Sequence, residues 1–240
     1  MFNIKKKNLN FALGIILTAW STCSWATGQY VYFGIMPTFS VTNLNWQIVN
    51  VSDQDQNDLP GAGETLLDGS TSNTQLGLFT GYGVLLKKFY LGVEGGMEFG
   101  RREAQSNGSD LITEEHLTNQ VTMSDIFLVD FRPGYVLTDK NTMLYGIVGL
   151  NLPRFRATQV TDDGELIQDS GYVRKNGYRL GLGYNLGLGR YFMGRIEYVF
   201  TKFPDFQFTD TFDNGDCSET SRLKVYSNEI NLGLSFVVNI

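Results

Sequence analysis

The chain has 240 residues, of which 27 are glycine and 13% are aromatic, and its formal net charge is −6. Such an acidic chain lacks the basic patch that a nucleic-acid-binding protein needs, so nucleic acid is excluded as a partner. No apolar run reaches the roughly 20 residues of a membrane-spanning helix, and the many glycines and aromatics suit a soluble β-sandwich or a membrane β-barrel.

The N-terminal segment has the three parts of a secretory signal peptide. Three lysines at positions 5–7 form its positive region, and residues 11–20 (FALGIILTAW) form its apolar core. Ser24-Trp25-Ala26 supplies small residues at the two positions that a signal peptidase reads. We therefore expect residues 1–26 to be a cleaved signal peptide.

Residues 27–240 are expected to form one domain, because their length suits a single barrel. Loss of the three signal lysines changes the formal charge from −6 to −9. Cleavage also removes Cys23 and leaves Cys217 alone, so the exported chain is expected to have no internal disulfide framework. The role of Cys217 stays open.

Apolar and polar residues alternate in eight later segments, which predicts eight β-strands. Each segment is long enough for a strand tilted across a bilayer, which takes about 9–11 residues. The predicted strands are 29–42, 74–86, 89–102, 125–137, 142–156, 177–188, 191–203 and 224–239. The first and fifth strands carry large apolar residues at both odd and even positions, so the alternation does not show which face of these strands meets lipid.

The connections alternate strictly between long and short. The long ones are 43–73, 103–124, 157–176 and 204–223, and the short ones are 87–88, 138–141 and 189–190. This pattern predicts an all-β fold, an eight-stranded antiparallel up-and-down transmembrane β-barrel with long extracellular loops and short periplasmic turns. Closure removes the sheet edges, which lipid could not solvate.

In most strands, the odd-numbered and even-numbered residues form two faces of different polarity. In 177–188, for example, Tyr178, Leu180 and Leu182 oppose Arg179 and Gly181. Lipid tolerates only the apolar set, so the polar set is expected to point inward. The inward set predicts a salt-bridged polar network in the lumen, with Arg102 at its outer rim: Glu94, Glu98, Asp130, Arg132, Arg179, Arg195, Glu197 and Glu229. A static polar plug and an ion gate are both compatible with such a network.

Six tyrosines lie near the ends of predicted strands, where aromatic girdles meet the membrane interfaces. They are Tyr30, Tyr32, Tyr90, Tyr178, Tyr191 and Tyr226. Residues 231–238 (NLGLSFVV) resemble the C-terminal strand signal by which outer-membrane barrels are recognised for insertion. We assign that signal to Asn231, Gly233, Phe236 and Val238.

The long connections are acidic. Residues 43–73 contain five acidic residues and no lysine or arginine, and 103–124 contain four and again no lysine or arginine. Such loops could bind divalent cations or a basic partner, whereas heparin-like ligands, which need basic patches, are disfavoured. His116, the only histidine, lies beside Glu114 and Glu115, but no motif links them. No catalytic, metal or cofactor residue is assigned.

With strands, loops and terminal signal in place, the chain resembles the small outer-membrane barrels of the OmpA/OmpX and opacity-protein type. The resemblance implies a Gram-negative outer-membrane location, and partners that include outer-membrane lipid, lipopolysaccharide, the insertion machinery and host-cell surfaces. It also implies a non-enzymatic surface antigen, adhesin or envelope scaffold. A narrow gated pore and a lipid A-modifying enzyme that uses His116 are the alternatives.

Overall fold

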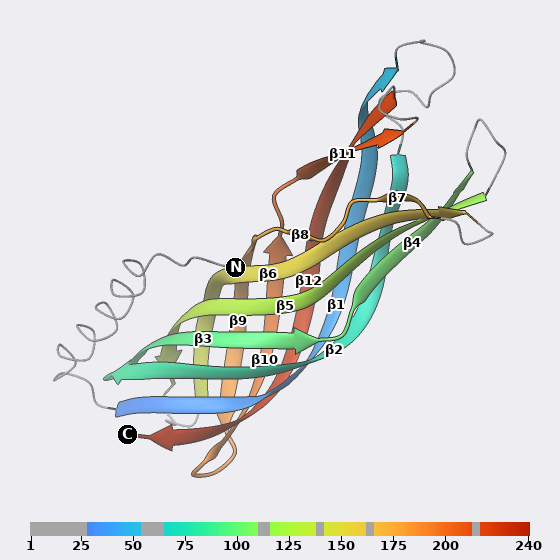
Figure 1. The fold of residues 1–240 in the computed structure, drawn as a ribbon. Coiled ribbons are helices and arrows are strands. Elements are labelled where there is room, and N and C mark those ends of the chain that lie inside the picture. Colours follow the sequence, from blue (N-terminus) through green and yellow to red (C-terminus); the bar gives the residue numbers. More distant parts are fainter. Residues whose placement is uncertain (1–27, 54–64, 110–115, 138–141, 162–165, 213–216) are drawn as a thin grey trace, which may run out of the picture.

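The fold is a closed antiparallel β-barrel (Figure 1). The computed structural model describes residues 28–53, 65–109, 116–137, 142–161, 166–212 and 217–240. Its long strands are β1 (Gly28–Asp53), β2 (Thr65–Leu86), β3 (Phe89–Phe99), β5 (His116–Val136), β6 (Thr142–Thr161), β9 (Gly177–Gly187), β10 (Phe192–Lys202) and β12 (Cys217–Asn239). Within these ranges, no helix is long and apolar enough to cross a membrane.

Each long strand pairs with the next one along the chain, and β1 pairs with β12 to close the ring. The pairing of β1 with β12 is long, because it runs from Tyr30 opposite Asn239 to Asp53 opposite Cys217. The prediction of an eight-stranded up-and-down barrel is therefore confirmed. The predicted turn at 87–88 is present and Lys87 has a φ of 61° there, whereas the predicted turn at 138–141 and the signal peptide lie outside the described residues.

Four short strands extend one end of the barrel. They are β4 (Arg102–Ser109), β7 (Leu166–Asp169), β8 (Val173–Arg174) and β11 (Phe206–Phe212). β4 continues β3 beyond a break at Gly100, whose φ of +112° favours glycine, and it pairs with β5. β7 and β8 pair with β6, and β11 pairs with β12. In Figure 1 these strands lie at the end opposite the C-terminus.

The predicted loop 43–73 is wrong over most of its length, because β1 continues to Asp53 and β2 begins at Thr65. At about 3.3 Å per residue, residues 43–53 add roughly 35 Å of strand. The predicted loops 103–124, 157–176 and 204–223 are likewise largely strand, in β4, β5, β6, β7, β8, β11 and β12. The reason is packing: Leu44, Trp46 and Ile48 point inward and are buried. These contacts stabilise the sheet beyond the bilayer.

The outer surface of the barrel carries a broad apolar band. On β9, Tyr178, Leu180 and Leu182 are 65%, 57% and 72% exposed, whereas Arg179 between them is 1% exposed. β3, β5, β10 and β12 alternate in the same way. The predicted division into a lipid-facing apolar set and an inward polar set is confirmed.

Three of the predicted girdle tyrosines are misplaced, and one of them, Tyr30, lines the periplasmic opening of the lumen. Tyr32 and Tyr90 point into the lumen and are 4% and 7% exposed. Each ring lies against a glycine of β2, since a Cβ added at Gly81 would overlap the Tyr32 ring and one at Gly83 the Tyr90 ring. A small inward residue on one strand thus makes room for a large one on the next.

Candidate functional site

The lumen holds one continuous ion-pair network. All eight predicted residues lie inside the barrel with at most 6% of their surface exposed. At its periplasmic end, Arg195 binds both oxygens of Glu94, at 2.7 and 3.0 Å. Arg132 lies 2.8 Å from the same Glu94 and also pairs with Glu197. Arg195 also lies 3.3 Å from Glu197, so both guanidiniums contact both carboxylates and the four charges form one cluster.

Arg102 and Arg179 form the extracellular half of the network. Arg102 lies 2.7 Å from Glu98 and 2.7 Å from Glu229. Arg179 lies 3.2 Å from Glu229 and 3.2 Å from Asp130. Arg102, expected at the rim, is therefore a central member, and it is 2% exposed.

Asp130 connects the two halves, since it contacts Arg179 at 3.2 Å and Arg132 at 3.4 Å. Four of the carboxylates each contact two guanidiniums, whereas Glu98 contacts only Arg102. Burial of a charge is costly unless it is paired and hydrogen-bonded. The pairing explains how five acidic side chains can occupy a narrow lumen.

Neutral side chains add hydrogen bonds to some of these charges, although Arg179 Nη2 and Arg132 Nε have no hydrogen-bond partner among the described residues. The Tyr145 hydroxyl donates to Glu197 at 2.7 Å, and Asn231 Nδ2 donates to its other oxygen at 3.1 Å. Arg102 Nε donates to Gln75 Oε1 at 2.6 Å. The Arg195 guanidinium lies 3.5 Å above the Phe79 ring. The network is therefore packed as well as paired, which favours a fixed arrangement over a hydrated channel.

A second layer closes the lumen above the network. This upper apolar layer consists of buried side chains from β1, β2, β5, β6, β11 and β12, together with Phe203, which follows β10: Leu44, Trp46, Leu67, Val121, Met123, Phe155, Phe203, Phe206, Leu223 and Val225. Phe155 packs against Phe203 and Phe206, with ring centroids 5.1 and 5.4 Å away. Reasoning from sequence missed this layer. Its signal was the alternation Leu44, Trp46, Ile48 with polar residues between them.

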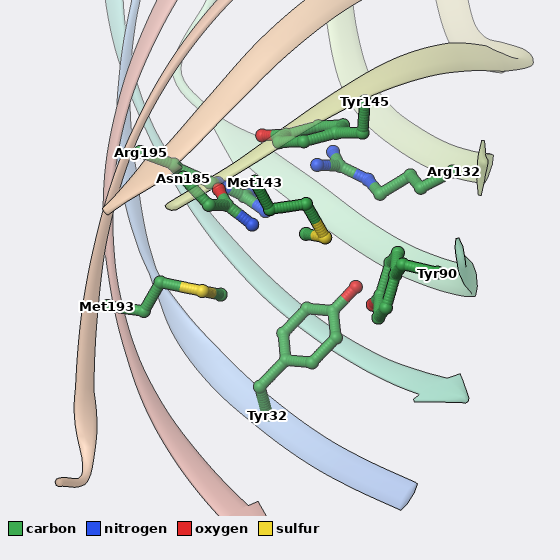
Figure 2. A pocket seen from close by; sticks show the side chains of 8 residues that line it. All are labelled: Tyr32, Tyr90, Arg132, Met143, Tyr145, Asn185, Met193 and Arg195. Carbon is green, nitrogen blue, oxygen red and sulfur yellow. The ribbon is translucent and has the colours of Figure 1, made fainter. Parts of the chain in front are cut away.

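The periplasmic end of the lumen is hollow. A cavity of about 550 Å³ opens there, with Lys87, Lys88 and Arg190 among its lining residues. Figure 2 shows Tyr32 and Met143 projecting into the smaller inner pocket, which Arg132 and Arg195 also line. The cavity ends at the ion-pair network. No group of three or more acidic, histidine or cysteine side chains in the described part of the chain could hold a metal ion.

Residues 15–237 match the family described as outer membrane protein beta-barrel domain. The chain belongs to this family. No curated protein matches it in sequence. Among solved structures, OprG from Pseudomonas aeruginosa is 15% identical, with 89% of this chain and 97% of that chain covered and a TM-score of 0.50. Ail from Yersinia pestis is 13% identical, with 88% and 99% covered and a TM-score of 0.39. The protein is thus a Gram-negative outer-membrane β-barrel.

The residues assigned to the insertion signal of this outer-membrane barrel lie on β12. Asn231 and Gly233 face the lumen, where the Arg195 side chain lies so close to Gly233 that a Cβ would be 2.6 Å from its Cγ. Phe236 packs outside against Phe33 and Tyr191, with centroids 5.5 and 5.8 Å away. Val238 is exposed. Recognition by the insertion machinery stays a prediction.

The extracellular tips of the barrel are described only in part. His116 begins β5 opposite Ser109 of β4, and Cys217 begins β12 opposite Asp53. Glu114 and Glu115 lie outside the described residues, as do most of the predicted loop acids. Two acids that are described form ion pairs on the outer surface: Asp125 with Arg154 at 2.8 Å and Asp169 with Arg156 at 2.7 Å.

Proposed function

We propose that this outer-membrane barrel is a non-enzymatic surface protein, an adhesin, surface antigen or envelope scaffold, that acts through its extracellular end. The observation that carries the proposal is the double closure of the lumen. Charged side chains with at most 6% exposure fill the middle, and the upper apolar layer lies above them. An eight-stranded barrel has room for side chains and little more. Function then belongs to the surface that the barrel presents.

The strand extensions support the same proposal. β1 and β12 stay paired up to Asp53 and Cys217, and β5 and β6 stay paired up to Leu117 and Thr161. A sheet that continues beyond the lipid-facing band holds the ends of the connections in fixed positions. Binding residues are often found on loops that a rigid scaffold positions.

The test is adherence of bacteria that display either the full barrel or a trimmed one. In the trimmed form, residues 54–64, 110–115, 162–165 and 213–216 are each replaced by a two-residue Asn-Gly turn, which suits a hairpin. A length-matched control replaces the same four segments with Gly-Ser sequences. Equal surface levels and equal heat-modifiable gel migration establish that all forms are folded.

A marked fall in host-cell adherence in both altered forms is the expected result for an adhesin. Equal adherence of all three forms would contradict that role and leave the envelope scaffold. The envelope role is then read from outer-membrane leakage of a deletion strain, which the trimmed barrel should repair as well as the full one.

A narrow gated pore is the second candidate, and the periplasmic cavity of about 550 Å³ favours it, because the lumen is already open on that side of the ion-pair network. Conductance of the refolded barrel in planar bilayers tests it. Discrete openings that Arg132→Ala alters would support a pore, whereas a silent bilayer supports display.

A lipid A-modifying enzyme is the third candidate, and it rests on the register that sets Ser109 opposite His116. Mass spectra of lipid A from strains with and without His116→Ala test it. Identical spectra from the wild-type strain, the variant and a strain lacking the protein would exclude this activity.

A further inference from the structure

The cavity at the periplasmic end of the lumen has the size of a small-molecule site. Its volume is about 550 Å³, and ligand pockets usually measure about 300–1,000 Å³. On its inner side it meets a pocket of about 10 Å³, which Arg132 and Arg195 of the ion-pair network help to line. A space of that size holds no more than about one water molecule. The periplasmic cavity is therefore open to the periplasm and closed toward the ion-pair network.

Aromatic and thioether side chains form the inner wall of the periplasmic cavity. Tyr32 of β1 and Tyr90 of β3 line it, and both are buried. Met143 of β6 and Met193 of β10 line it from other strands, and Figure 2 shows all four side chains around the inner pocket. A tyrosine ring offers an apolar face for stacking and a hydroxyl for hydrogen bonding. Methionine adapts to irregular shapes, so this wall suits a flat apolar body.

One polar side chain of this wall has an atom without a partner. Asn185 of β9 is 5% exposed, and its Oδ1 atom has no hydrogen-bond partner among the described residues. Its side chain lines both the periplasmic cavity and the inner pocket, where Figure 2 shows it. Most buried side-chain polar atoms are hydrogen-bonded, and leaving one unpaired is costly. Asn185 therefore favours a molecule in the cavity that brings a polar group to this wall.

Three cations surround the opening of the periplasmic cavity. Lys87 and Lys88 lie in the turn between β2 and β3, and Arg190 lies in the connection between β9 and β10. All three side chains are exposed, and none of the described residues that line the cavity is acidic. The cluster at the inner end pairs two guanidiniums with two carboxylates, so it adds no net charge. A cleft lined by charges of one sign concentrates ions of the opposite sign.

We propose that the periplasmic cavity binds a small aromatic anion, a molecule with one flat ring system and one carboxylate or phosphate. Its rings lie against Tyr32 and Tyr90, and its anionic group lies at the opening among Lys87, Lys88 and Arg190. Because stacking and charge act at opposite ends of the molecule, they fix its orientation. The ligand enters and leaves from the periplasm, since the inner end is closed. This proposal is independent of the display function, which belongs to the other end of the barrel, and it requires no conduction.

The test measures binding of 2-naphthoate to the full barrel in phosphatidylcholine nanodiscs at pH 7. Isothermal titration gives the affinity and the stoichiometry, and empty nanodiscs give the heat of partition into lipid, which is subtracted. The neutral analogue 2-naphthol has the same ring system without the negative charge. Phosphatidylcholine carries no net charge, so it does not compete as an anion for the basic opening.

Two charge variants separate the opening from the rest of the surface. The rim variant combines Lys88→Gln with Arg190→Gln. The matched control combines Lys202→Gln with Arg101→Gln, and it also removes one lysine and one arginine, which are exposed on the extracellular half. Unchanged heat-modifiable gel migration establishes that each variant is folded.

A filled variant tests whether the binding site is the cavity itself. Met193→Trp places a larger side chain in the wall of the cavity, and Met143→Trp does so from β6 if the first substitution prevents folding. A folded barrel of either kind should bind neither naphthoate nor naphthol.

The wild type is expected to bind one naphthoate per barrel, more tightly than naphthol. The rim variant should bind naphthoate about five- to tenfold more weakly, because it loses two exposed charge contacts, and should bind naphthol as the wild type does. The charge control should match the wild type with both molecules. Equal affinity of the wild type for the two molecules, wild-type affinity in the rim variant, or no binding beyond that of empty nanodiscs would overturn the proposal. Full binding by a folded filled variant would also overturn it, because the site would then lie outside the cavity.

Discussion

Arg102 of β4 and Glu229 of β12 are 127 residues apart in sequence, and their side chains meet inside the barrel at 2.7 Å. In the ring, β1 and β2 lie between the two strands, because β4 continues β3 and pairs with β5 in its place. The pair therefore joins two walls of the lumen that share no backbone hydrogen bond. Contacts of this kind, together with the long β1–β12 register, make closure of the barrel cooperative.

Replacing Arg102 with methionine should destabilise the barrel by about 3–5 kcal/mol, the usual cost of leaving a buried charge without its partner. Glu98 loses the only guanidinium it contacts, while Glu229 keeps Arg179. Urea unfolding in lipid vesicles, followed by gel migration of the folded form, measures the change.

The control for this substitution is Arg101→Met, because Arg101 precedes Arg102 and is exposed. It should change the free energy of unfolding by no more than about 0.5 kcal/mol. Equal effects of the two substitutions would mean that the network adds nothing specific to stability.

Gly183→Ala should lower stability by about 1–3 kcal/mol through overpacking. A Cβ there would overlap the ring of Tyr145, whose hydroxyl holds Glu197 at 2.7 Å. Gly95→Ala is the matched control, since a Cβ at that strand position meets no atom within 4 Å. Thermal unfolding of the two variants compares them directly, and a larger loss in the Gly95 variant would contradict this packing argument.

Conductance should require disruption of both closing layers. Glu197→Ala combined with Arg132→Ala weakens the network, and Trp46→Ala combined with Phe155→Ala opens the upper apolar layer. In planar bilayers, neither double variant should conduct steadily, whereas the quadruple variant should, because each layer by itself excludes water. Steady current in the network variant alone would show that the apolar layer does not seal.

Asp169 should make the extracellular end sensitive to acid. Hydrogen bonds from Arg156, with a further one from the Gly171 backbone N–H, lower the pKa of its carboxyl below the ordinary value. A folded-state pKa below the unfolded one means that the ionised form stabilises the fold. This contribution is complete above the unfolded pKa of about 3.9 and disappears as the pH falls through the folded pKa.

Comparison with Asp169→Asn isolates the effect. The wild type should be more stable by up to about 1 kcal/mol at pH 7, the range for a largely exposed pair, and the difference should vanish in strong acid. Melting temperatures of both forms across this pH range measure it. A difference that persists unchanged in strong acid would assign the effect to packing.

The fold could be predicted from sequence because apolar and polar residues alternate with a two-residue period in a strand that has lipid on one face and the lumen on the other. Leu180 and Leu182 meet lipid while Arg179 meets the lumen, which is the alternation expected of a transmembrane barrel strand. The same parity identified Glu94, Arg132 and the other members of the network. It failed where apolar residues replaced polar ones inside, as at Trp46, which was assigned to a loop.

By itself, then, the amino-acid sequence determined the strand order, the lipid-facing surface and the inward polar residues, since these depend on local alternation and connection length. Only the tertiary structure decided which charges pair, that Tyr32 and Tyr90 turn inward, and that the strands extend beyond the bilayer. Those outcomes depend on stagger between strands, which sets Gly81 beside Tyr32 and Arg102 beside Glu229. The stagger is set when the whole ring closes, so it cannot be read from the residues of any single strand.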